Sequence, residues 1–117
     1  MRIIDLHKSI IDQWIDENPI PEGNGWESYT ISLRLVNLIK WSIRGNALKK
    51  HWILSLEIQA RFLSKKIEKH LLGNHIFANA KALLFAGLFF KGNEAKKWYK
   101  QGIKILCKEL DEQVLDD

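Results

Sequence analysis

Apolar residues recur at helical spacing along most of the chain, in segments separated by Gly, Asn and Pro. The first segment ends at about Asp16. Its apolar positions, which would share one helix face, are Ile3, Ile4, Leu6, Ile10, Ile11, Trp14 and Ile15. Pro19 and Pro21 then stop the helix, because the residue before a proline avoids helical geometry. Residues 17–25 are therefore expected to form an irregular loop.

A second helix is predicted over residues 28–43, with Ser28 or Thr30 as its N-terminal cap. Its positions on a shared stripe are Ile31, Leu35, Leu38, Ile39 and Ser42. Gly45 follows at the position where a left-handed residue commonly ends a helix. The pattern thus predicts an amphipathic helix with one buried face.

A third helix is predicted over residues 47–71, and it is also one-sided. One face carries Trp52, Leu56, Gln59, Leu63 and Ile67, and another carries Lys65, Lys66 and Lys69. Gly73 is expected to close this helix, and Asn74 is suited to cap the next one.

The fourth predicted helix, residues 76–90, is apolar nearly all round, which favours a central position. After a turn at Lys91-Gly92-Asn93, a fifth helix is predicted over residues 94–114, with Trp98, Ile103, Ile105, Leu106 and Leu110 as its apolar positions. Short connections favour antiparallel neighbours. The last three helices should therefore form two consecutive hairpins, as in a toroid or solenoid.

Length and composition favour a single all-α domain. The 117 residues are 46% hydrophobic and include only two Pro and seven Gly. The longest apolar run, residues 82–90, is about half of what a membrane span needs, and charged residues interrupt any N-terminal signal sequence. We therefore expect no membrane partner.

The residues suited to metal binding do not form a recognisable set. Cys107 is the single cysteine, and His7, His51 and His70 lack ligand spacing to acidic or thiol partners. We expect no metal and no cofactor, and we expect Cys107 to pack as a small apolar residue.

Charge is distributed unevenly. Residues 31–108 contain 16 Lys or Arg against 3 Asp or Glu, whereas both ends of the chain are acidic. Such a field favours an anionic partner, such as an acidic polysaccharide, a nucleic acid or a membrane surface, but lysines also solubilise outer helix faces. No reading helix or aromatic platform for nucleic acid is recognisable, so we expect no nucleic-acid partner.

Several motifs together resemble the heparinase II/III-like polysaccharide lyases. They are Gly25-Trp26-Glu27, residues 32–37, Ser55-Leu56, Gln59-Ala60, Gly73-Asn74-His75, residues 79–83 and 87–90, Ala95, Trp98, Gly102, Leu106, Glu109, Leu110 and Gln113. The resemblance implies an incomplete (α/α) toroid, here an interior piece of about five helices without the β-sandwich that follows it. It also implies cleavage of uronic-acid polysaccharides by β-elimination.

In such lyases an Asn-His pair binds the uronate carboxylate, so the resemblance implies this role for Asn74, with His75 assisting or acting as the base for one uronate epimer. Quenching the carboxylate charge is needed before the weakly acidic C5 proton can leave. The alternative is that Asn74 is an ordinary helix cap and His75 a polar surface residue.

Further substrate-binding candidates have structural alternatives. Arg34 and Asn37 could reach substrate from one helix face, or they could tie helices together through a buried hydrogen bond, and Asn79 is a similar case. Trp26 and Tyr29 could stack on sugar rings, or they could belong to the core.

The tyrosine acid of similar lyases belongs to a segment beyond residue 117, and neither Tyr29 nor Tyr99 matches its motif. We therefore expect this chain alone to be inactive, with an anionic uronate-containing polysaccharide as the partner of the parent protein. Self-association, or contact with the remainder of the parent, is also expected for apolar surface left exposed. The competing interpretation is a non-catalytic helical-repeat module that binds proteins, although no period recurs.

Overall fold

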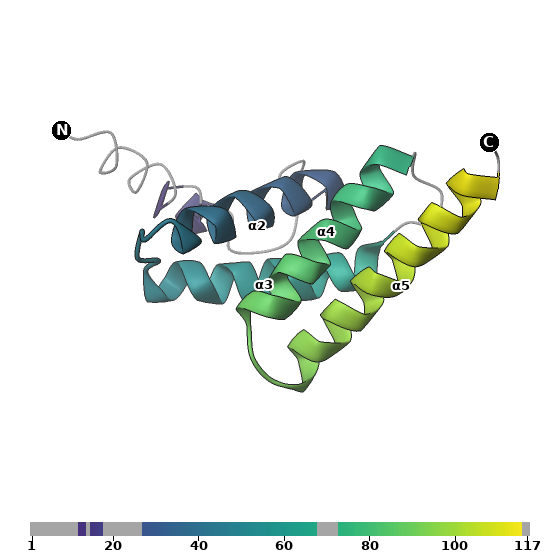
Figure 1. Cartoon of the computed structure of the whole chain (residues 1–117). Coiled ribbons are helices and arrows are strands. Elements are labelled where there is room, and N and C mark those ends of the chain that lie inside the picture. The colour runs from purple at the N-terminus through teal and green to yellow at the C-terminus, as the bar shows by residue number, and fades with distance from the viewer. Residues whose placement is uncertain (1–11, 14, 18–26, 68–72, 116–117) are drawn as a thin grey trace.

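The computed structural model describes residues 12, 13, 15–17, 27–67 and 73–115 (Figure 1). Four helices account for most of this part: α2 (Ser28–Ile43), α3 (Lys50–Lys66), α4 (Gly73–Phe89) and α5 (Asn93–Leu115). Residues 12, 13 and 15–17 are also helical, and no strand occurs within the described ranges. The predicted all-α class is confirmed.

Helices α2 and α3 run antiparallel, side by side, and α4 crosses them obliquely (Figure 1). Helix α5 then returns along α4. Helix α4 contacts each of the other three, most extensively α5 and then α2, as its nearly uniform apolar sequence predicted. The expected hairpin of α4 and α5 is present. In the second expected pair, α3 and α4, the contact is smaller, and α4 contacts α2 more extensively than α3.

The core lies where these helices meet. Its buried members are Ile31, Leu35, Val36, Leu56, Ala60, Leu63, Ala82, Leu83, Ala86, Ala95 and Trp98. These residues include the main positions of the stripes predicted for α2 and α3, and Trp52 and Gln59 of α3 are buried as well. Helical periodicity therefore identified the inward faces correctly.

The two ends of α2 are held differently. Ser28 does not cap the helix. Glu27 precedes it in extended geometry without a side-chain cap, and the Ser28 hydroxyl instead donates to the carbonyl of Lys66 at the end of α3, at 3.3 Å. Carbonyls in the last turn of a helix commonly need hydrogen-bond donors from outside the helix, and the serine provides one for α3. At the other end, Gly45 has φ of 99° and its N–H donates to Ser42, as predicted for a left-handed terminus.

The boundary between α3 and α4 differs from the prediction. Helix α3 begins at Lys50 and its last helical residue is Lys66, because Ile67 turns to extended geometry; residues 68–71 of the predicted helix lie outside the described residues. Gly73 does not close α3 but begins α4, and Asn74 lies inside α4 rather than capping it. Contacts of the following turn with α2 support this earlier start.

Glycine lets α4 and α5 approach closely. A Cβ at Gly87 would lie 2.8 Å from both the Cβ and the backbone nitrogen of Tyr99, and 2.9 Å from the Ala95 carbonyl. A Cβ at Gly102 on α5 would lie 2.9 Å from the Ala80 carbonyl of α4. Each helix therefore presents a glycine to the backbone of the other.

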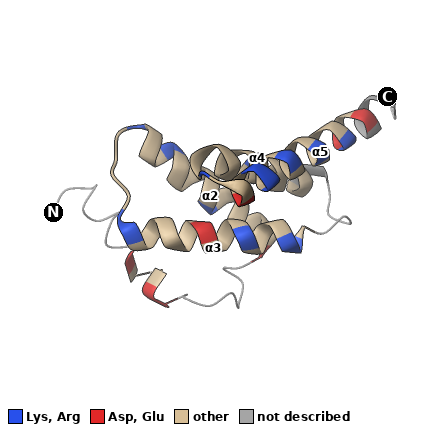
Figure 2. Ribbon diagram, turned by 90° about the horizontal axis from the view of Figure 1, so that it is seen from below, with Lys and Arg blue, Asp and Glu red and all other residues tan. Residues whose placement is uncertain are grey.

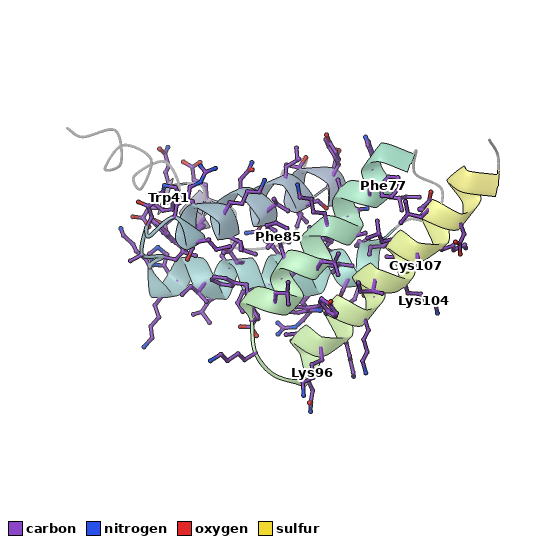
Figure 3. All side chains as sticks on the ribbon, in the orientation of Figure 1. Trp41, Phe77, Phe85, Lys96, Lys104 and Cys107 are labelled. Atoms are coloured by element: carbon purple, nitrogen blue, oxygen red, sulfur yellow. The ribbon has the colours of Figure 1, made fainter. Side chains whose placement is uncertain are left out.

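The outer side of α5 is basic. Figure 3 labels Lys96, Lys104 and Cys107 along this helix, and all three are exposed. The expectation that Cys107 packs in the core is wrong, because the positions of α5 that face the core are Ala95, Trp98 and Gly102, and Cys107 lies off their helical stripe.

The carboxylate of Asp12, one of the described helical residues before α2, joins this segment to the start of α3. Asp12 accepts hydrogen bonds from Lys49, from Nε2 of His51 at 2.7 Å, and from the indole N–H of the buried Trp52. The hydrogen bond from Lys49, followed by that from Trp52, lowers the pKa of Asp12 to about 2. The group is thus held in its charged form throughout the neutral range.

An ion pair joins α3 to α5. Arg61 donates to both carboxylate oxygens of Glu94, each at 2.7 Å, and to Glu57 on its own helix at 3.0 Å. The hydrogen bond from Arg61 lowers the pKa of Glu94, and the same bond raises the pKa of Arg61. Because these groups are well exposed, water screens the pair, and its main effect is to orient the first turn of α5.

We predict that Gly87→Ala destabilises the protein by about 1–3 kcal/mol, because a forced separation of α4 and α5 outweighs the roughly 1 kcal/mol that Ala gains in helix propensity. Denaturant unfolding followed by circular dichroism measures the change. Leu88→Ala is the matched control, since Leu88 is 74% exposed on the same helix; it should shift stability by less than about 0.5 kcal/mol. An unchanged midpoint for Gly87→Ala would contradict the close approach.

Asp12 also generates a pH prediction. Its folded-state pKa of about 2 lies below the ordinary 3.8, so its stabilising contribution is present above about pH 4 and is lost as the pH falls toward 2. Asp12→Asn should therefore lower the free energy of unfolding at neutral pH. Between about pH 4 and 2 the variant should lose less stability than wild type, and unfolding midpoints measured across that range check this. Asp16→Asn, which removes an exposed carboxylate of the same segment, should retain the wild-type stability at neutral pH.

Candidate functional site

The first turns of α2 and α4 meet through two aromatic rings. Tyr29 stacks on His75 with ring centroids 4.3 Å apart and ring planes 17° from parallel. Tyr29 is 38% exposed and His75 is half-buried, so the pair lies at the surface of the crossing. The Tyr29 ring covers one face of the imidazole, and its role in stacking on a sugar ring stays a prediction.

A buried hydrogen bond lies one helical turn further along the same two helices. The Ser32 hydroxyl donates to Oδ1 of Asn79 at 2.7 Å and lies 2.8 Å from the carbonyl of Ser28. A hydroxyl has one proton, so it serves these two acceptors in turn. Asn79 is fully buried, and its Nδ2 has no hydrogen-bond partner among residues 27–67 and 73–115. Asn79 therefore joins α4 to α2.

Asn74 is the second residue of α4 and directly precedes His75. Its side chain lies outside the described residues. The backbone places it in the first turn, where N–H groups lack acceptors within the helix and the helix dipole gives partial positive charge. An anion is therefore favoured at this end of α4.

Arg34 is bound within the fold on the opposite side of α2. Its Nη1 donates to Oε1 of Gln59 at 2.6 Å, and Nε2 of Gln59 donates to Oγ of Ser55 at 3.1 Å. Burial lowers the pKa of Arg34 to about 10, which leaves the group charged at neutral pH. The hydrogen bond from Arg34 to Gln59 joins α2 to α3, and the role of Arg34 as a substrate ligand stays a prediction.

The remaining candidates are Asn37 and Trp26. Asn37 is exposed on α2, and Trp26 lies outside the described residues. Their roles as substrate ligands stay predictions. Ser32, Ser55 and Gln59 were not selected from the sequence as polar contacts, although a polar residue inside an apolar stripe is a usable signal of a buried hydrogen bond.

Positive charge surrounds the helices. Exposed lysines on α3, α4 and α5 are Lys50, Lys65, Lys66, Lys81, Lys96, Lys97, Lys100, Lys104 and Lys108 (Figure 2). No group of three or more His, Cys, Asp and Glu in the described ranges is arranged to hold a metal ion. No helix described here is both long and apolar enough to cross a membrane.

Comparison with known proteins identifies the family. The profile of the family described as Heparinase II/III N-terminus matches residues 8–117. The chain belongs to the Heparinase II/III N-terminus family. The resemblance seen in the sequence is therefore confirmed over nearly the whole chain.

Similarity to a curated member of this group is more local. A heparin-sulfate lyase of Bacteroides stercoris is 41% identical over 46 residues, which is 38% of this chain and 7% of the lyase. No solved structure matches the chain significantly. The heparinase II/III assignment thus rests on the family profile, and the chain corresponds to a small part of the lyase that it matches.

We predict that Ser32→Ala lowers the free energy of unfolding by about 1–3 kcal/mol, because it leaves the buried Asn79 oxygen without its donor. Adding Asn79→Leu should recover much of this loss, since replacing both polar partners removes the unpaired group. Thermal and denaturant unfolding measure both steps. Asn37→Ala, on the exposed side of α2, is the control and should change stability by less than about 0.5 kcal/mol. Strictly additive losses from the two changes would speak against the bond.

Proposed function

We propose that this chain is a segment of an (α/α) toroid in a polysaccharide lyase, and that it carries the carboxylate-binding part of a β-elimination site. The observation that supports this most directly is the match of the Heparinase II/III N-terminus family over residues 8–117, with Asn74 and His75 in the first turn of α4. Residues 1–117 would form one helical domain of that toroid.

In this proposal Asn74 neutralises the uronate carboxylate. Its amide N–H donates to a carboxylate oxygen, and the unpaired backbone N–H groups of the first turn of α4 add partial positive charge. These donors stabilise the enolate-like state as negative charge moves from C5 onto the carboxylate. The C5 proton thereby becomes acidic enough for a protein base to remove.

His75 would then assist the carboxylate contact or accept the C5 proton from one uronate epimer. As that proton leaves, its electron pair forms the C4=C5 double bond, the C4–O bond breaks, and the departing oxygen takes a proton from an acid. Neither Tyr29 nor Tyr99 is assigned as this acid, because neither matches the tyrosine motif of similar lyases. We propose that residues 1–117 alone bind substrate without turning it over.

The experiment is a binding titration of the 117-residue chain with a heparan sulfate oligosaccharide and with its carboxyl-reduced form, which keeps the sulfates. Wild type should bind the first ligand more tightly. Asn74→Ala and His75→Ala should each weaken binding by roughly tenfold, as expected for a charge-assisted hydrogen bond worth about 1.5 kcal/mol. Both variants should erase the preference for the carboxylated ligand.

Two controls separate site binding from general charge attraction. Asn93→Ala removes an exposed asparagine from the first turn of α5, and Lys104→Gln removes one exposed cation. Neither should alter the preference between the two ligands. Equal affinity of wild type for both oligosaccharides would contradict the carboxylate site, and new ultraviolet absorbance from an unsaturated product would contradict inactivity of the isolated chain.

A further inference from the structure

Tyr29 and His75 contact each other through the faces of their rings. With ring planes only 17° from parallel and centroids 4.3 Å apart, the phenol ring covers one face of the imidazole. Both imidazole nitrogens lie on the ring edge, which a stacked partner leaves uncovered. Tyr29 therefore restricts the orientation of His75 without occupying the atoms that would bind a ligand or move a proton.

The buried hydrogen bond below this pair prevents the two rings from sliding apart. Tyr29 and Ser32 are three residues apart on α2, and His75 and Asn79 are four apart on α4, so the two contacts lie on the same faces of the two helices. Ser32 and Asn79 are both buried. A shift of α4 along α2 would break their bond in the absence of water, which is costly.

We propose that Tyr29 is a positioning residue that fixes the imidazole plane of His75, so that its nitrogen edge is presented to the uronate carboxylate. This inference rests on the proposed carboxylate-binding function. A histidine at a helix start without such a neighbour would sample several rotamers, and binding would have to order it. Stacking orders it in advance.

The stacking itself is tested first, without any ligand. In the NMR spectrum of the 117-residue chain, the carbon-bound imidazole protons of His75 should be shifted upfield by the tyrosine ring and should show nuclear Overhauser contacts to it. His75→Gln identifies the signals. Tyr29→Phe should preserve the upfield shift and Tyr29→Leu should remove it. Absence of the shift and the contacts in wild type would overturn the proposal, whatever the variants do.

The effect on binding is tested with the heparan sulfate oligosaccharide. Tyr29→Leu should weaken its binding roughly threefold to tenfold, as expected for ordering one side chain on binding, and Tyr29→Phe should restore wild-type affinity. Tyr99→Leu is the matched control, because Tyr99 is exposed to nearly the same extent, 39%, and lies on α5. Its affinity should equal that of wild type.

The outcomes separate this proposal from the function on which it rests. If wild type shows the ring-current shift but no preference for the carboxylated oligosaccharide, the carboxylate site fails, and with it the role of Tyr29. If His75→Ala weakens binding but Tyr29→Leu does not, the carboxylate site stands and the positioning role is overturned. Equal losses in Tyr29→Leu and Tyr29→Phe would also overturn it, because the ring face would then be irrelevant.

Discussion

The hydrogen bond between Ser32 and Asn79 lies where α2 and α4 cross, with both side chains withdrawn from water. Apolar contacts at a helix crossing tolerate small shifts, whereas a buried polar pair is satisfied in a narrow range of distances and angles. This pair therefore sets the register of α4 on α2. The position of His75 against Tyr29, one turn earlier, follows from that register.

Helix α4 can hold this position because it is supported on its other sides. Glycines at 87 and 102 bring its backbone close to α5, and its small and apolar residues fill the space toward α2 and α3. The polar first turn thus belongs to a helix, α4, that packs against α2, α3 and α5. Such rigid support keeps the side chains of the first turn in place. The exposed lysines of α3, α4 and α5 create a field that attracts anions.

Hydrophobic periodicity, together with the Gly, Asn and Pro residues between segments, predicted the helices well where one helix face is apolar. The bounds of α2, Ser28–Ile43, agree with the prediction, as do the turn at Gly45 and the central place of α4. The predicted start of α4, at residue 76, is too late, because the helix begins at Gly73 with a polar first turn. Contacts with α2 support this turn, and the apolar pattern of α4 does not reveal it. Ser28 was misassigned because its hydroxyl satisfies a carbonyl of another helix.

Sequence alone determined the helical class, the inward helix faces, the basic middle of the chain and the family. Each of these depends only on the types of residues and on their spacing along the chain. Only the tertiary structure decided which partners the polar side chains contact. In that structure Arg34 donates a hydrogen bond to Gln59, and the buried Asn79 accepts one from Ser32. Asn37 is exposed, and Tyr29 stacks on His75. The reason is physical: a polar side chain takes the partner that the crossing of two helices brings within reach, and no periodicity within a single helix encodes that crossing.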